Sequence, residues 1–180
     1  MITFSTNTAG RIEKIVHLFD STFSDSEGPD AGAAIGALVQ DIFARTPAED
    51  LVTILALDGS QLSGAICFTR LAYDDEPRNV FLLSPVAVAT TSQGTGVGQA
   101  LLTHGLGQMR ARGVDVVLTY GNPDYYGKVG FRPITEREAQ APLPLSQPEG
   151  WLGQSLTETL LTPLAGPSRC VAAFDQPDLW

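Results

Sequence analysis

Three glycines at alternate positions, Gly94, Gly96 and Gly98, follow an apolar stretch and open a segment with helical periodicity. The N-terminus of a helix presents unpaired backbone N–H groups and the positive end of the helix dipole, so it attracts anions. Glycines remove the side chains that would keep a phosphate away from the backbone. The segment therefore predicts a phosphate site built from main-chain amides, with a plain strand-to-helix turn as the alternative.

Two common phosphate-binding loops can be compared with this segment. The P-loop requires a Gly-Lys-Ser/Thr ending, which is absent here. The dinucleotide fingerprint requires Gly-x-Gly-x-x-Gly, and the third glycine comes one residue too early for it. Asp115 lies about 20 residues further on, where such a site holds a ribose, so this reading is weakened but stays open.

Composition favours one folded domain over residues 1–180, because 43% of the residues are hydrophobic and 17% are charged. The net charge of −9 argues against a nucleic-acid partner or an anionic membrane surface. We find no apolar run long enough to span a bilayer and no secretion signal, so we expect a cytoplasmic protein. Cys67 and Cys170 lie far apart in apolar segments without metal-ligand spacing, which predicts buried thiols and no metal.

Hydrophobic spacing predicts the elements that lead to the glycine loop. Two helices are expected, separated by a polar loop over 24–30 and followed by a stop at Pro47. Three strands should then form an antiparallel meander, with a tight turn at Asp58-Gly59. A first strand is expected over 2–5, before the helices, and the three strands of the meander over 51–57, 61–73 and 80–88. The apolar face of the first helix should carry Ile12, Ile15, Val16, Phe19 and Phe23. That of the second should carry Ile35, Leu38, Val39, Ile42 and Phe43.

Beyond the loop, a helix from Val97 should end at Gly113, with Gly105 letting it lie close to the sheet. The next strand, over 114–118, should run parallel to the strand over 80–88 through a right-handed crossover. Pro85 lies inside that earlier strand and has no N–H for a ladder. We therefore expect pairing to fail near Ser84 and Pro85, so that the two strands splay apart beside the glycine loop.

Residues 136–180 are rich in proline but too apolar for a disordered tail. They contain two expected strands, near 151–156 and 169–174. We expect this extension to pack on the core formed by residues 1–135 and to complete the sheet. One of its strands could also pair across a homodimer.

Two motifs in the correct order resemble the GNAT superfamily of acyl-CoA-dependent N-acetyltransferases. Gln93-Gly94-Thr95-Gly96-Val97-Gly98 is similar to the family's Q/R-x-x-G-x-G/A motif, and Tyr126-Gly127-Lys128-Val129-Gly130-Phe131 is similar to its Tyr-x-x-x-Gly-Phe ending. The order of elements resembles the family over about the first 135 residues, and the later part looks like a branch of bacterial N-acetyltransferases. The resemblance implies an α/β fold with a mixed, largely antiparallel sheet, splayed fourth and fifth strands, and helices on both faces.

The resemblance also implies a cosubstrate, acetyl-CoA, and roles for particular residues. The backbone of the strand over 80–88 would pair with the pantetheine arm, and an N–H near its Val86 would stabilise an oxyanion. Tyr126 would be the general acid for the departing thiolate, although it could instead be a core aromatic, and Tyr125 is its neighbour. The implied binding residues are Val86, Ala87 and Val88 for pantetheine, Gln93, Gly94, Thr95, Gly96, Val97 and Gly98 for the pyrophosphate, and Asn122 for another part of CoA.

The acceptor and the general base stay open at this stage. Many relatives carry a glutamate on the strand that corresponds to 80–88, which contains no acid here. Acids at Glu27 and over 74–76 are alternatives, as is a base-free reaction of a neutral amine. The acidic segments 25–30 and 74–76 favour a cationic acceptor, a small molecule or a peptide with a primary amine. The rival functions are an inactive acyl-CoA sensor and a dinucleotide-dependent oxidoreductase.

Overall fold

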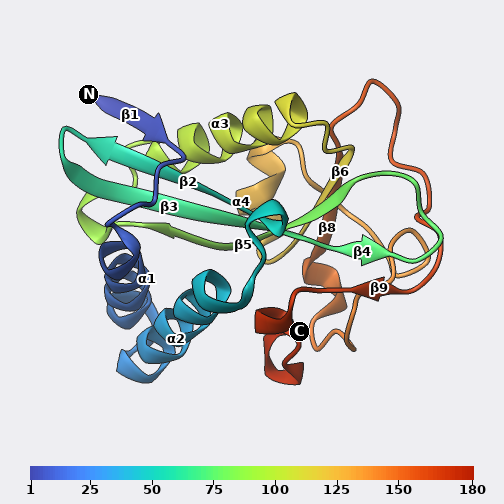
Figure 1. The fold of residues 1–180 in the computed structure, drawn as a ribbon, viewed down its shortest axis with the longest axis horizontal. Coiled ribbons are helices and arrows are strands. Elements are labelled where there is room, and N and C mark those ends of the chain that lie inside the picture. Colours follow the sequence, from blue (N-terminus) through green and yellow to red (C-terminus); the bar gives the residue numbers. More distant parts are fainter. The chain divides into compact units, whose positions relative to one another are not determined.

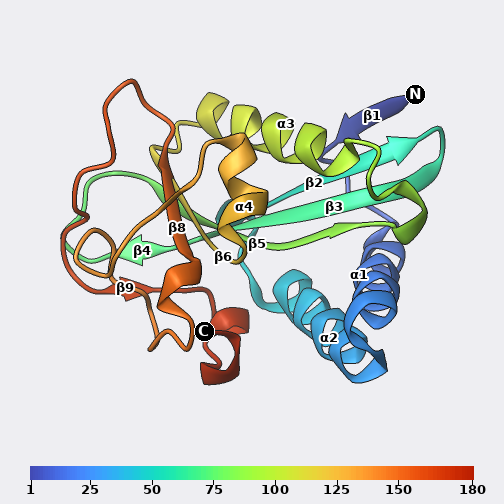
Figure 2. The same ribbon diagram turned by 180° about the vertical axis from the view of Figure 1, so that it is seen from behind.

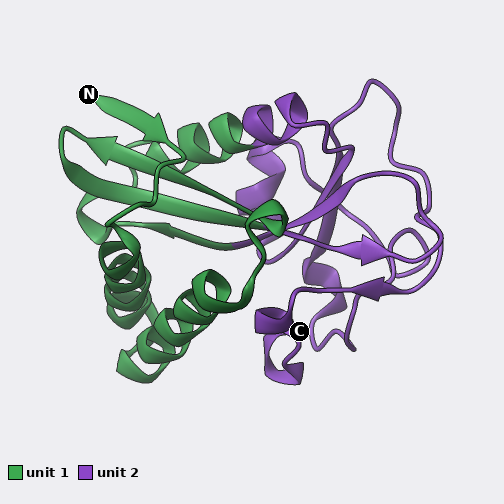
Figure 3. Ribbon diagram, in the orientation of Figure 1, with its two compact units in different colours: residues 1–68, 85–105 green, residues 69–84, 106–180 purple.

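The computed structural model describes all residues 1–180 and divides into two compact units (Figure 3). The first unit comprises Met1–Phe68 and Pro85–Gly105, and the second comprises Thr69–Ser84 and Leu106–Trp180. Three elements run from one unit into the other. They are β3 (Gln61–Arg70), β5 (Val80–Val88) and α3 (Val97–Ala111).

In the first unit, the strand order is β1 (Ile2–Ser5), β2 (Leu51–Asp58), β3 and the end of β5. β1 pairs antiparallel with β2, with Ile2 opposite Asp58. The connection from β2 to β3 passes through Gly59 at φ +61°, a left-handed conformation that suits glycine. The predicted strands over 2–5 and 51–57 and the tight turn between β2 and β3 are confirmed.

Two helices, α1 (Ile12–Glu27) and α2 (Pro29–Arg45), follow β1 with a single residue between them. The polar loop expected over 24–30 is therefore wrong. Gly28 at φ +99° reverses the chain alone, and Pro29 is suited to the first turn of α2 because its missing N–H would have no helical partner there. The two helices approach closely, since a Cβ added to Gly32 would lie 2.4 Å from the carbonyl oxygen of Asp20.

Helices cover both faces of the strands in the first unit, as Figures 1 and 2 show for α1 and α2 on one side and α3 on the other. On β3, Ala65 packs with α1 and α2 in a buried cluster that includes Ile15 and Phe19. Its neighbour Ile66 faces the other way, because successive strand side chains alternate. A Cβ added to Gly105 of α3 would lie 2.6 Å from Ile66 Cδ1, which confirms the predicted close approach.

In the second unit, the start of β5 pairs parallel with β6 (Val116–Tyr120), as predicted. β6 begins two residues later than expected, because Asp115 instead accepts a hydrogen bond from the backbone N–H of Asn79 at 2.7 Å and so joins the residues that precede β6 and β5. β8 (Trp151–Ser155) then pairs antiparallel with β6, and β7 (Arg132–Pro133) pairs with β8. The extension thus inserts a strand between β6 and β7.

The remaining strands are shorter than predicted. The strand expected over 61–73 ends at Arg70, and β4 (Ala72–Tyr73) instead pairs with β9 (Ser168–Arg169) in a separate two-stranded sheet. The strand expected over 169–174 is wrong, because Ala172–Phe174 forms a 3-10 turn whose Phe174 carbonyl accepts the indole N–H of Trp180 at 2.9 Å. The expectation that 1–180 forms one domain stays a prediction.

None of the helices has the length and apolar character needed to cross a bilayer. Cys67 is buried, and burial raises the pKa of its thiol to about 12, as expected for an inert core cysteine. Cys170 is partly buried, and the two thiols are unpaired.

Candidate active site

The glycine loop connects β5 to α3 through a short 3-10 turn over Thr90–Ser92. Gly94 and Gly96 adopt φ angles of +73° and +87°, and an added Cβ would meet no atom within 4 Å at either. These glycines are therefore required by backbone conformation and not by packing. The first helical hydrogen bond runs from the Ala100 N–H to the Gly96 carbonyl, which leaves the preceding amides of the first turn pointing outward.

Side chains hold the loop from within and from α1. Gln93 Nε2 donates to the carbonyl of Val88 at 3.1 Å, and Thr95 Oγ1 donates to the carbonyl of Ser92 at 2.6 Å. Thr90 Oγ1 donates to Asp25 Oδ2 at 2.6 Å. The Gln93 and Thr95 side chains are thus engaged with the protein backbone. The contact between Asp25 and Thr90 was missed by sequence reasoning, which placed Asp25 in an acidic loop that would favour a cationic acceptor.

The end of β5 presents two sets of backbone groups. The N–H of Ala89 donates to the carbonyl of Ser63 on β3 at 2.9 Å. Backbone groups alternate sides along a strand, so Ala87 also faces β3, and a Cβ added to Gly64 would lie 3.2 Å from the Ala87 oxygen. Val86 and Val88 therefore direct their backbone groups away from β3. Ala87, 2% exposed with its side chain in the core, is less suited to the predicted ligand contact than its two neighbours.

Pairing along β5 changes near Pro85, as predicted. The parallel ladder with β6 runs from Val80–Val116 to Leu83–Thr119, whereas β5 continues to Val88. Two backbone hydrogen bonds flank this region, from the Leu71 N–H to the Val80 carbonyl and from the Ala89 N–H to the Ser63 carbonyl. The pairing registers that these two bonds define differ by one residue. A one-residue shift of this kind is what a β-bulge produces.

In the second unit, Tyr126 ends the short helix α4 (Pro123–Tyr126). Burial raises the pKa of its hydroxyl to about 12, the nearby Tyr125 adds to the rise, and a hydrogen bond with Thr119 opposes it. Thr119 Oγ1 in turn donates to the carbonyl of Leu83 at 2.8 Å, at the last pair of the parallel ladder. The Tyr126 hydroxyl is therefore protonated at neutral pH and lies next to the point where β5 and β6 stop pairing.

The ring of Tyr126 is fixed by close neighbours. Phe131 and Tyr125 pack edge-on against it, with ring centroids at 5.8 Å and 5.1 Å. A Cβ added to Gly121 would lie 2.8 Å from Tyr126 Cε2, so only glycine leaves room for the ring. Tyr125 is partly buried, and burial raises its pKa as well, but it lacks the contact with Thr119. The role of Gly121 was missed, although a glycine three residues after the strand predicted over 114–118 was its visible signal.

Asn122 has a structural role. Its Oδ1 accepts a hydrogen bond from the Asp124 N–H at 2.8 Å and caps the start of α4. The side chain is exposed, and its amide Nδ2 is the polar group that stays available. The predicted contact of Asn122 with CoA stays a prediction.

The acids considered as bases are engaged by cations or lie on the surface. Asp74 pairs with Arg169, and Glu76 pairs with Arg78 at 2.6 Å, which lowers the pKa of Glu76 to about 2. Such a carboxylate is too weak a base to accept a proton from an amine. Glu27 is exposed at the end of α1.

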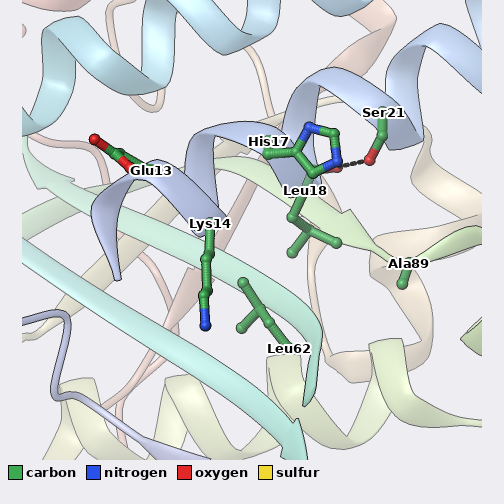
Figure 4. Close-up of a pocket in the computed structure, with 7 residues that line it drawn as sticks. All are labelled: Glu13, Lys14, His17, Leu18, Ser21, Leu62 and Ala89. Carbon is green, nitrogen blue, oxygen red and sulfur yellow. Dashed lines mark hydrogen bonds between the residues drawn. The ribbon is translucent and has the colours of Figure 1, made fainter. Parts of the chain in front are cut away.

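One histidine lines a cavity that sequence reasoning did not assign. This cavity of about 480 Å³ lies in the first unit, and His17 shares it with Lys14 and Ser21 of α1 (Figure 4). Across from the helix, it is bounded by Leu62 of β3 and by Ala89, the residue after β5. The other histidine, His104, stacks on Phe4 at 4.4 Å and is used in packing.

Comparison with known proteins agrees with this geometry. Residues 3–134 match the model of an acetyltransferase (GNAT) domain. The chain belongs to the GNAT acetyltransferase family. It is 33% identical over 141 residues to the uncharacterized N-acetyltransferase YjhQ of Escherichia coli strain K12, which covers 76% of this chain and 75% of that protein. The resemblance deduced from the two motifs is therefore confirmed, and the chain is an acyltransferase.

Solved GNAT structures share the fold. An acetyltransferase from Brucella melitensis, in complex with acetyl-CoA, superposes with a TM-score of 0.75 at 20% identity, over 97% of this chain and 99% of that one. YhbS from Escherichia coli, in complex with CoA, gives 0.74 at 20% identity, over 98% of this chain and 92% of that one. The predicted GNAT fold class is confirmed. The dinucleotide reading is wrong, and Asp115 instead accepts the N–H of Asn79 and joins the starts of β5 and β6.

Proposed function

We propose that this GNAT protein transfers an acetyl group from acetyl-CoA to the primary amine of a small molecule or a peptide. One observation carries the proposal. Beyond its last pair with β6, β5 directs the backbone groups of Val86 and Val88 away from β3 and then runs directly into the glycine loop. A thioester carrier with an amide-bearing arm and a pyrophosphate matches both features.

For the carrier, we assign the pantetheine arm to the backbone of Val86 and to the N–H of Val88, whose carbonyl accepts from Gln93; these groups would pair with the arm as an added strand. Amides of the glycine loop would hold the pyrophosphate, with a conformation that only glycine adopts at Gly94 and Gly96. With a net charge of −9, the protein as a whole repels a polyanion, so these local dipoles must supply the attraction. The amides assigned to the pyrophosphate are those of Gly94, Thr95, Gly96, Val97 and Gly98. The N–H of Gln93, also expected from the sequence, donates to the carbonyl of Thr90 at 3.4 Å.

For the chemistry, the amine nitrogen forms a bond to the acetyl carbon while the bond from carbon to sulfur breaks. The N–H near Val86 is assigned to the negative charge that develops on the carbonyl oxygen. Tyr126 donates its proton to the departing thiolate and regains one from water, and the proton lost by the amine passes to water. A hydroxyl with a pKa of about 12 stays protonated at the pH at which an amine attacks. No dedicated base is needed when the amine arrives neutral.

Two measurements test the proposal. Calorimetry should detect binding of acetyl-CoA, and a thiol-release assay over a panel of amines should detect turnover. Binding without thiol release from any amine would instead favour an acyl-CoA sensor. If calorimetry detects no binding of acetyl-CoA, both the acetyltransferase proposal and the sensor alternative are refuted.

A further inference from the structure

A second cavity, of about 310 Å³, lies wholly within the second unit. Its walls come from the end of β6 and from two later segments of the chain. The residues that matter below are Tyr120, Gly121, Ser146, Gln147, Asp178 and Trp180. None of the features that led to the proposed function includes this cavity.

The charge of the cavity favours a cationic ligand. Asp178 is the one acid that lines it, and no lysine, arginine or histidine does. The Asp178 carboxylate is exposed and has no hydrogen-bond or ion-pair partner. Among the acids that the sequence suggested for a cationic acceptor, Asp25 bonds to Thr90, Asp74 pairs with Arg169 and Glu76 pairs with Arg78.

Aromatic rings form a rigid wall beside this carboxylate. Tyr120 stacks on Trp180 with ring centroids at 6.2 Å, and Trp151 packs edge-on against Trp180 at 6.0 Å. The Tyr120 hydroxyl accepts the Gln147 N–H at 2.7 Å, and the Trp180 indole donates to Phe174. Trp180 is only 4% exposed, so its ring is a fixed wall, and the partly buried ring of Tyr120 is the aromatic surface that an ammonium group can approach.

Gly121 connects the cavity to the proposed acid. It lines the cavity, and it also lies against the ring of Tyr126, where an added Cβ would be 2.8 Å from Cε2. Its N–H donates to the carbonyl of Gly150, and a Cβ on Gly150 would lie 3.1 Å from the Gly121 oxygen. Gly121 therefore borders both the cavity and the ring of Tyr126 without a side chain of its own.

We propose that this cavity binds a cationic group of the acceptor, with Asp178 as its counter-charge and the rings of Tyr120 and Trp180 as its wall. The inference rests on the proposed function. A group held as an ammonium has no lone pair for attack on the thioester, so the reacting nitrogen must be a second one. The volume suits a short chain, which makes the acceptor class a small diamine or polyamine.

The test compares 1,4-diaminobutane with butylamine in the thiol-release assay. We expect kcat/KM to be at least about tenfold higher for the diamine, in line with one charge-assisted contact. Asp178→Asn should remove most of this preference by raising KM for the diamine, with little change in kcat. Asp175→Asn is the matched control, because it removes an exposed acid outside the cavity. A diamine preference that survives Asp178→Asn would overturn the proposal.

A binding measurement separates this inference from the proposed function. Trp180 and Trp151 are the only tryptophans, so titration with 1,4-diaminobutane without acetyl-CoA should change the intrinsic fluorescence. If the titration responds to Asp178→Asn while no amine is acetylated, the cavity assignment holds and the proposed function fails. If amines are acetylated but neither assay responds to Asp178→Asn, the proposed function holds and the cavity assignment fails.

Discussion

The glycine loop is a site built from backbone groups, whereas the site around Tyr126 is built from a tightly packed side chain. The loop depends on main-chain amides and on left-handed φ angles at Gly94 and Gly96, with open space around both. Tyr126 depends on a side chain held by tight packing against Gly121 and Phe131. A backbone site is thus sensitive to conformation, and a side-chain site is sensitive to volume. Substitutions that change one property at a time can separate the two.

The largest effect is expected from Gly96→Val, which forces a branched residue into φ +87°. The loop must then change its conformation, and affinity for acetyl-CoA should fall by at least about 100-fold, since several amide contacts are lost together. Calorimetry measures this directly. Gly59→Val is the matched control, because Gly59 has φ +61° with open space and lies in the hairpin of the same unit. It should lower stability with normal binding, and equal losses in both variants would refute the loop assignment.

Tyr126→Phe should lower kcat by about 100-fold and leave affinity for acetyl-CoA nearly unchanged, because it removes only the proton donor. Tyr125→Phe, which alters the adjacent hydroxyl, should retain most of the activity. Equal kcat in the wild type and in Tyr126→Phe would remove this hydroxyl from the mechanism.

The pH dependence gives a second measurement on the same residue. An acid acts in its protonated form, so its contribution is lost only as the pH rises through its pKa, which burial raises to about 12. We therefore expect no fall in wild-type kcat from this group up to at least pH 10. A fall near the ordinary pKa of tyrosine, about 10, would show that the hydroxyl is not desolvated.

The contrast between the two regions also explains what the sequence could predict. β5 and the glycine loop were predicted with their correct bounds, because apolar runs and glycine spacing are local signals. The position of Tyr126 followed from a family motif. The contact of Asp25 with Thr90 joins residues 65 positions apart, and no local pattern reports it.

Two errors in the prediction have different physical causes. The expected loop over 24–30 was wrong because polar residues can continue a helix when one glycine at Gly28 makes the turn. The expected strand over 169–174 was wrong because the indole of Trp180 holds the turn at Phe174. In both regions, contacts with residues elsewhere in the chain or the conformation of a single residue outweighed local propensity.

A smaller effect is expected from Gly121→Ala, which adds one methyl group where the Tyr126 ring lies. The ring must move by a few tenths of an ångström or more, and kcat should fall by about tenfold, since proton transfer depends on position. Gly107→Ala adds the same methyl group in open space on α3 and should leave kcat unchanged. The double variant Gly121→Ala with Tyr126→Phe should be no slower than Tyr126→Phe alone. An additive loss would mean that Gly121 acts independently of the tyrosine.

The smallest effect is expected from Thr90→Val, which removes the hydroxyl that donates to Asp25 at 2.6 Å and keeps the side-chain shape. An exposed hydrogen bond contributes about 1 kcal/mol, so affinity for acetyl-CoA should fall by about fivefold with kcat at saturation unchanged. Asp25→Ala, which removes the acceptor, should give a similar loss, whereas Asp30→Ala, which alters another acid in the same region, should not. Calorimetry on the two single variants and on the double variant Thr90→Val with Asp25→Ala decides the point. If the losses of affinity add in the double variant, Thr90 and Asp25 support the loop separately. Their side chains would then contribute directly to a site that we attribute to backbone conformation.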